Sequence, residues 1–134
     1  MPVKSEIPFD HGHFFITFTC YKWLQLIDIT DGYDLVYNWF NILNKQGHFI
    51  TGYVIMPNHL HATIAFRKTG KNINKIIGDG KRFIGYAIVK RLKEKGLNAL
   101  LQQLENGCWL KTLSAINIVL PGFIWVENKV YTRY

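Results

Sequence analysis

The residues with the clearest chemical potential are two histidines, His59 and His61, which stand one residue apart in the apolar run "GYVIMPNHLHATIAF" (residues 52–66). Alternate residues of a β-strand point to the same side of a sheet, so both imidazoles would leave one face while Leu60 points into the core. Two neutral imidazoles this close can chelate one divalent transition metal, and Mg²⁺ or Mn²⁺ would need further oxygen ligands. The spacing therefore allows a metal site. Two histidines with ordinary hydrogen bonds are the alternative that this pattern leaves open.

A cluster of positive charge follows the histidine pair. Residues 67–95 contain ten Lys and Arg and two acidic residues, a net charge of +8, whereas the whole chain carries +7. A localised basic segment suits a polyanion such as nucleic acid, and a merely solvated helix face is the alternative. On charge placement alone, we predict these DNA phosphate contacts: Arg67, Lys68, Lys71, Lys75, Lys81 and Arg82.

These residues need a scaffold, and hydrophobic periodicity indicates its elements. Strands are predicted at residues 13–20, 49–56 and 59–66, and helices at residues 31–46, 72–95 and 97–106. Pro57 and Asn58 are expected to form the turn of a β-hairpin. Thr30 or Asp31 can cap the first helix, and a break at "GDG" (residues 78–80) is the alternative to one long second helix. The order strand, helix, strand, strand, helix predicts an α+β fold, a ferredoxin-like split βαβ antiparallel sheet with helices packed on one face.

Length and composition indicate a single domain. The chain has 134 residues, of which 49% are apolar and 15% aromatic, enough for an ordinary hydrophobic core. No apolar run approaches the ~20 residues of a membrane helix, and the first residues lack the apolar core of a signal peptide. We therefore expect a cytoplasmic protein with no membrane partner. Cys20 and Cys108 lack a paired motif, so free thiols are expected and a zinc site is not.

The turn and strand around the histidines carry a family resemblance. "MPNHLH" (residues 56–61), followed by "NINKIIGDGKRFIGYAIVKRLKEKG" (residues 72–96), resembles the HUH motif and the following helix of the single-tyrosine transposases. These include the REP-associated tyrosine transposases and the transposases of small insertion sequences. The resemblance covers residues 12–107. It implies single-stranded or hairpin DNA as the partner, a monomer or homodimer, and Mg²⁺ or Mn²⁺ held by His59 and His61.

The same resemblance implies metal-assisted strand cleavage and joining. In the family, a tyrosine on a later helix attacks the scissile phosphate, which gives a 5′-phosphotyrosine and a free 3′-hydroxyl. Residues 1–107 form the expected transposase-like HUH domain. The divergent tail, residues 108–134, matches neither the tyrosine helix nor the third metal ligand of the family. A shifted reading frame or a shortened gene would explain that tail.

The nucleophile is therefore the open question in the sequence. Tyr131 is the main catalytic candidate, with Tyr86 and Tyr134 as weaker ones. The alternative is a catalytically dead, truncated transposase remnant that only binds DNA. Two further classes are an RNA-binding module, for which Phe15 is the evident stacking residue on the open sheet face, and a histidine hydrolase without covalent capture.

Overall fold

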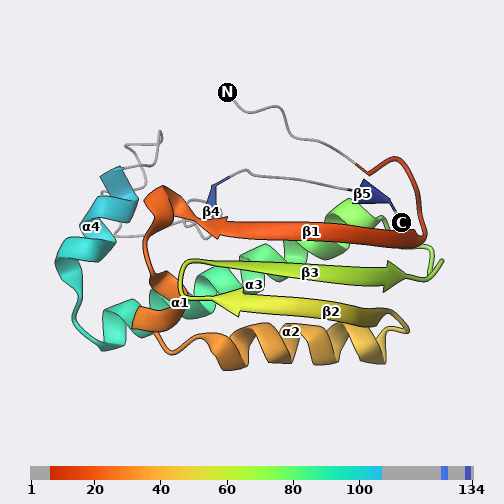
Figure 1. The fold of residues 1–134 in the computed structure, drawn as a ribbon. Helices are drawn as coiled ribbons and strands as arrows, with labels where there is room; N and C mark the ends of the chain where they lie inside the picture. The colour runs from red at the N-terminus through yellow and green to blue at the C-terminus, as the bar shows by residue number, and fades with distance from the viewer. Residues whose placement is uncertain (1–6, 107–124, 127–131, 134) are drawn as a thin grey trace.

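The computed structural model describes residues 7–106, 125–126 and 132–133 (Figure 1). In chain order, the elements are β1 (Gly12–Cys20), the 3-10 helix η1 (Tyr21–Trp23), α1 (Leu26–Ile29), α2 (Tyr33–Lys45), β2 (Phe49–Met56), β3 (His59–Phe66), α3 (Ile73–Glu94), α4 (Asn98–Asn106), β4 (Trp125–Val126) and β5 (Thr132–Arg133). No helix within these ranges has the length and apolar character needed to cross a membrane. The mixture of helices and antiparallel strands confirms the predicted α+β class.

The sheet has the strand order β2-β3-β1-β4, with β5 also paired to β1, and every pairing is antiparallel. Strands β2 and β3 form the predicted hairpin, and β3 lies between β2 and β1 (Figure 1). The register places Thr17 directly opposite His61, and Thr19 opposite His59. This order is the one expected for a split βαβ unit, because β3 is inserted between β1 and β2, the two strands that the first helices connect.

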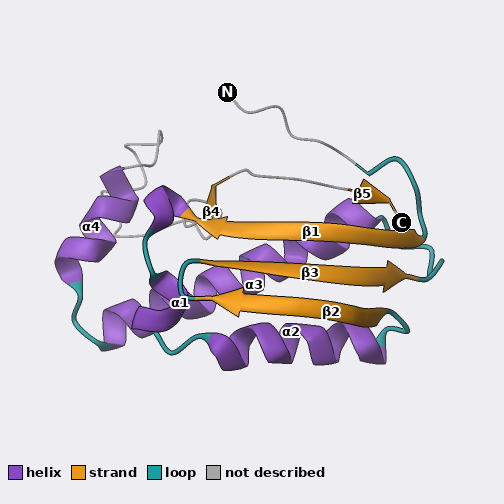
Figure 2. Ribbon diagram, viewed as in Figure 1, coloured by secondary structure: helices purple, strands orange, loops and turns teal. Residues whose placement is uncertain are grey.

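One face of the sheet packs against α2 and α3 (Figure 2). The Phe18 ring stacks on Trp39 of α2 with centroids 5.3 Å apart, and it lies 5.0 Å from Nζ of Lys81 on α3. Both helices therefore cover the same side of β1. Burial alternates along most of β1 and all of β3, as predicted, which leaves His59 and His61 on the opposite face.

The start of α2 differs from the prediction. Its N-cap residue is Gly32, with no capping side chain, so neither Thr30 nor Asp31 caps it. Thr30 instead closes the short α1, where its Oγ1 donates a 2.7 Å hydrogen bond to the carbonyl oxygen of Leu26. Asp31 has a φ of +48°, outside the extended region that N-cap residues adopt. The predicted cap is wrong because α1, absent from the prediction, uses Thr30 as its C-cap.

Helix α3 is continuous through "GDG", so the alternative of a break there is wrong. Asn72 caps the helix, and its Oδ1 accepts a 2.8 Å hydrogen bond from the backbone N–H of Asn74. Gly80 lies where α3 approaches α2, and a Cβ at this position would collide with the indole of Trp39. The glycine thus permits a close approach of two helices.

Cys20 is buried and free, as predicted. Burial raises the pKa of its thiol to about 12, which keeps the sulfur protonated and unreactive. Cys108 lies outside the described residues.

Candidate metal centre

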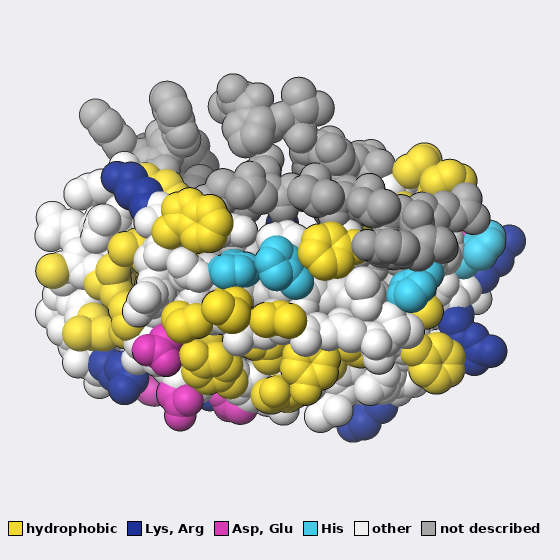
Figure 3. Space-filling view, in the orientation of Figure 1, with side chains coloured by type: hydrophobic (Ala, Val, Ile, Leu, Met, Phe, Trp, Pro, Cys, Tyr) yellow, Lys and Arg dark blue, Asp and Glu magenta, His cyan; other side chains and the backbone are white. Residues whose placement is uncertain are grey.

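His59 and His61 lie on the face of the sheet that α2 and α3 leave open. Figure 3 looks onto this face and shows histidine side chains across it. The two ring centroids are 4.9 Å apart, and the ring planes are inclined by 72°. A metal–nitrogen bond is about 2.1 Å long, so the centres of two imidazoles on one ion lie roughly 5 Å apart. The pair therefore has a spacing that one cation can bridge.

Each imidazole is held at its Nδ1 atom by a neighbouring oxygen. Nδ1 of His59 lies 2.7 Å from Oδ1 of Asn58, and because that oxygen only accepts, the nitrogen is the donor. Nδ1 of His61 lies 2.8 Å from Oγ1 of Thr17 and can donate in the same way. In these tautomers both Nε2 atoms keep the lone pair that a metal needs, and the partner oxygens fix the ring orientations.

The surroundings of His61 favour its neutral form. Burial lowers the pKa of this imidazole, and the neighbouring His59 lowers it further. Phe15 of β1 stacks on the His61 ring, with centroids 5.3 Å apart and planes inclined by 22°. Because a neutral imidazole is the form that binds a cation, the electrostatics of His61 suit a ligand.

The turn that carries Asn58 is tied to the last residue of β1 and to the segment that follows. The backbone N–H of Cys20 donates to the carbonyl oxygen of Asn58 at 2.9 Å. The backbone N–H of Ile27 donates to the carbonyl oxygen of Pro57 at 3.1 Å. The amide nitrogen of Asn58 also donates to the carbonyl oxygen of Trp23 at 3.4 Å. These bonds position Asn58 and, through it, the ring of His59.

Two imidazoles supply only part of a coordination sphere. Across residues 7–106 and the two short described strands, no three His, Cys, Asp or Glu side chains gather as a metal site. The remaining positions would be taken by oxygen atoms of a substrate or of water, an arrangement that suits Mg²⁺ or Mn²⁺. The donor set thus fits a cation that binds together with a phosphate.

The predicted phosphate contacts do not lie beside the histidine pair. Two follow β3, one precedes α3 and three lie on α3, which covers the other face of the sheet: Arg67, Lys68, Lys71, Lys75, Lys81 and Arg82. Arg82 forms an ion pair with Asp79 at 3.0 Å, and Lys68 contacts Asp10 at 3.6 Å. Their role as phosphate contacts stays a prediction. DNA that touched both α3 and the histidines would have to pass around an edge of the sheet.

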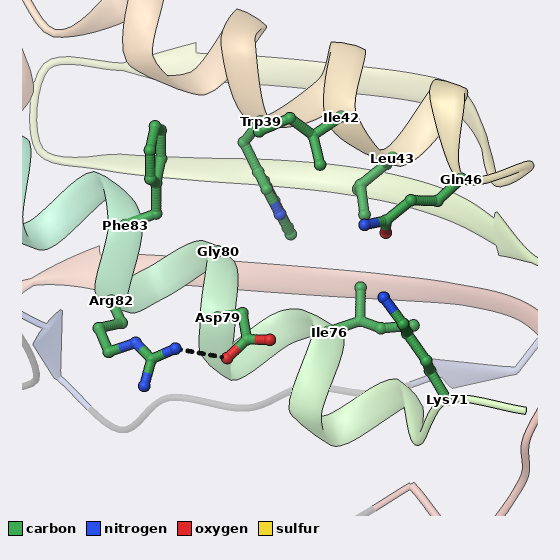
Figure 4. A pocket seen from close by; sticks show the side chains of 10 residues that line it. All are labelled: Trp39, Ile42, Leu43, Gln46, Lys71, Ile76, Asp79, Gly80, Arg82 and Phe83. Carbon is green, nitrogen blue, oxygen red and sulfur yellow. Dashed lines mark hydrogen bonds and ion pairs between the residues drawn. The ribbon is translucent and has the colours of Figure 1, made fainter.

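Two of these basic side chains line a cleft of about 300 Å³ between α2 and α3 (Figure 4). Trp39 and Ile42 of α2 and Phe83 of α3 provide apolar walls, and Lys71 and Arg82 lie toward opposite ends in this view. The cleft is on the helical side of the sheet, so it is separate from the histidine pair.

Sequence reasoning missed three roles in this site. No local signal indicates that Thr17 bonds to His61, because that contact depends on the strand register. The sequence indicates only a turn at Asn58. It gives no signal for Trp23, whose φ is positive and whose ring centroid lies 5.9 Å from that of His59. Tyr131, the predicted nucleophile, lies outside the described residues.

Two solved transposase structures are similar to this fold. A crystal structure described as a "putative transposase" from Deinococcus radiodurans R1 has a TM-score of 0.59 and 12% identity, and the match covers 100% of this chain and 86% of that chain. A REP-associated tyrosine transposase bound to a REP hairpin has a TM-score of 0.53 and 13% identity, with 100% and 62% covered. This chain therefore has a transposase-like fold.

The comparisons go no further than the fold. This chain spans less than two thirds of the REP-associated tyrosine transposase, of which 62% is covered. No known family model matches the sequence, and no curated protein matches it. The family resemblance drawn from "MPNHLH" is thus confirmed at the level of fold, while the metal and the chemistry stay proposals.

Proposed function

We propose that this chain binds single-stranded or hairpin DNA together with Mg²⁺ or Mn²⁺, and that it cleaves and rejoins the strand through a 5′-phosphotyrosine. The observation that carries the proposal is the pair of imidazoles on the open sheet face, 4.9 Å apart and each anchored at Nδ1. The transposase-like fold supports it. Since one structural neighbour is bound to a REP hairpin, a DNA hairpin is the first substrate to test.

The chain's own residues would bind and orient the reacting groups. Nε2 of His59 and of His61 would hold the cation, while Asn58 and Thr17 keep the rings in place. When bound, the cation would polarise the scissile phosphate and offset the negative charge that develops on it. Both imidazoles are half-buried, so each keeps a surface that a phosphodiester can approach.

Strand cleavage requires a nucleophile, for which we propose Tyr131. Its oxygen would form a bond to phosphorus while the P–O3′ bond breaks, and the proton lost by the tyrosine is balanced by the one that the 3′-oxygen gains. The phosphotyrosyl bond retains the energy of the phosphodiester. A 3′-hydroxyl can therefore attack it and rejoin the strands without another energy source.

Covalent trapping tests this proposal. The full chain is incubated with Mn²⁺ and a labelled DNA hairpin that carries single-stranded flanks, and adducts are resolved on a denaturing gel. We expect an adduct from the wild type and none from His59→Ala, His61→Ala or Tyr131→Phe. His13→Ala is the matched control, because Nε2 of His13 contacts Thr51 at 2.6 Å instead of joining the pair. If His59→Ala and His61→Ala gave as much adduct as the wild type and the His13→Ala control, the proposal would be wrong.

A DNA-binding protein that cannot cleave is the second candidate. One observation supports this second candidate: in the part of the chain that the structure describes, no third His, Cys, Asp or Glu completes a metal site with the pair. Hairpin binding that weakens steeply with salt, with no adduct in Mn²⁺, would support this candidate over the first.

A further inference from the structure

Trp23, the last residue of η1, lies beside the histidine pair. Its ring centroid is 5.9 Å from that of His59, and the ring planes are inclined by 76°. Trp23 is 60% exposed, more than any other large hydrophobic side chain in the described ranges. Figure 3 shows hydrophobic side chains on both sides of the central histidines. Since single exposed apolar residues are common, the exposure matters only if the structure holds the indole in place for a reason.

The backbone holds Trp23 in a conformation that is intrinsically unfavourable. Trp23 has a φ of +57° and Lys22 a φ of +51°, both in the left-handed region that residues other than glycine rarely adopt. Such residues persist where surrounding contacts fix them, and they cluster at binding sites. Here the amide nitrogen of Asn58 donates to the Trp23 carbonyl oxygen at 3.4 Å, and the N–H of Leu24 donates to the Tyr21 carbonyl oxygen at 3.1 Å.

Asn58 connects the backbone of Trp23 to a proposed metal ligand. Its amide nitrogen bonds to the backbone of Trp23, and its amide oxygen, 2.7 Å from Nδ1 of His59, orients that imidazole. One side chain therefore joins the backbone of Trp23 to the imidazole that would hold the cation. A tryptophan that is exposed by chance would need no such connection.

We infer that Trp23 is a stacking platform for an unpaired nucleobase whose own phosphate lies over His59 and His61. The inference rests on the proposed function, and it adds the residue that would bind the base next to the reacting phosphate. A base and its phosphate are separated by one deoxyribose, so a ring beside His59 is within reach. Stacking of this kind tolerates any base, because every base has a π-face. The exposed Lys22 adds positive charge for a flanking phosphate.

Phe15, the other aromatic residue against the pair, has a different role. Its ring stacks on His61 with planes inclined by only 22°, so the imidazole covers one of its faces. Phe15 supports the position of His61. Trp23 meets His59 near a right angle and keeps most of its surface open, which is the arrangement that a stacking base requires.

A double-mutant cycle tests the inference. The probe is a DNA hairpin with a short single-stranded extension, in Mn²⁺, together with a series in which each nucleotide of the extension in turn is abasic. We expect Trp23→Ala to weaken binding of the intact probe by roughly 5- to 150-fold. One abasic position should weaken wild-type binding by a similar factor, and there the two losses should not add. Trp23→Tyr should keep most of the affinity, because an aromatic ring remains.

Two further variants make the cycle decisive. Tyr37→Ala is the matched control and should bind like the wild type, because Tyr37 is 44% exposed but lies on α2, where no DNA contact is predicted. Trp23→Leu keeps apolar bulk without the ring, and it replaces the alanine variant if that variant does not fold. Wild-type affinity in Trp23→Leu, or losses that add at every abasic position, would overturn the inference and leave the proposed function intact. If the wild type bound no DNA in Mn²⁺, both would be overturned.

Discussion

Thr17→Val tests most directly how the histidine pair is held. Thr17 lies opposite His61 in the β1–β3 pairing, and its Oγ1 is 2.8 Å from Nδ1 of that imidazole. Valine has nearly the same shape and favours a β-strand, so the sheet should persist while this one hydrogen bond is lost. Without the bond, nothing from β1 fixes the His61 tautomer that presents Nε2 to a cation.

The expected effect of Thr17→Val is larger on metal binding than on stability. Loss of a single hydrogen bond lowers the unfolding free energy by about 0.5–1.5 kcal/mol. Loss of the partner that orients a metal-bound histidine lowers metal affinity by roughly 10- to 100-fold, or about 1.4–2.7 kcal/mol. We therefore expect Mn²⁺ affinity to fall by that factor while the variant remains folded at room temperature.

Calorimetric titration with Mn²⁺ gives the affinity, and thermal unfolding followed by circular dichroism gives the stability. Thr63→Val is the matched control. Thr63 lies on the same face, but its Oγ1 bonds to that of Thr51 at 2.9 Å and not to a ring of the pair. It should lose a hydrogen bond and keep its Mn²⁺ affinity. Equal Mn²⁺ affinities for the Thr17 and Thr63 variants would refute the reasoning.

Three further predictions concern the scaffold. Gly80→Ala should lower the unfolding free energy by about 1–3 kcal/mol, because the added Cβ meets the Trp39 indole. Gly78→Ala, with open space around its Cβ, should raise it by about 0.5–1 kcal/mol, and the opposite order in urea titrations would contradict this packing. Arg91→Lys should lower the unfolding free energy by about 0.5–1 kcal/mol, since lysine cannot keep both contacts, 2.8 and 2.7 Å, with the carboxylate of Asp34 on α2. An unchanged urea midpoint would mean that solvent screens the pair. Burial lowers the pKa of His48 in the folded protein, so as the pH falls this imidazole is protonated in the unfolded chain before it is protonated in the folded one. The unfolding free energy should therefore fall as the pH drops below about 6.5. His48→Gln should reduce that slope, and identical slopes in unfolding from pH 7 to pH 5 would exclude this histidine as a cause.

The spacing of apolar residues along the sequence is sufficient to predict the main strands and helices. In β3, alternation places Leu60 in the core and the histidines on the other face, as the structure has them. The errors arise where a residue serves a distant contact. Thr30 closes α1 and so cannot open α2, and Gly80 makes room for the Trp39 ring of another helix. Local propensity contains neither fact.

The imidazole pair can be predicted from the sequence, but the residues that hold it cannot. Thr17 and His61 are 44 positions apart and meet only because of the β1–β3 register. Trp23 reaches His59 through a left-handed backbone, which no hydrophobic pattern encodes. The basic residues of α3 illustrate the converse. They follow the histidines closely in the chain, yet their helix covers the opposite face of the sheet, because proximity in sequence does not determine the side.

The central claim is that His59 and His61 together hold a cation where a DNA phosphate binds. It is tested most directly by measuring Mn²⁺ binding with and without a DNA hairpin, in the wild type and in the His59→Ala/His61→Ala double variant. We predict that the hairpin tightens Mn²⁺ binding, that Mn²⁺ tightens hairpin binding by the same factor, and that the double variant loses both effects. Mn²⁺ affinity that is unchanged in the double variant, or independent of DNA in the wild type, would contradict the claim.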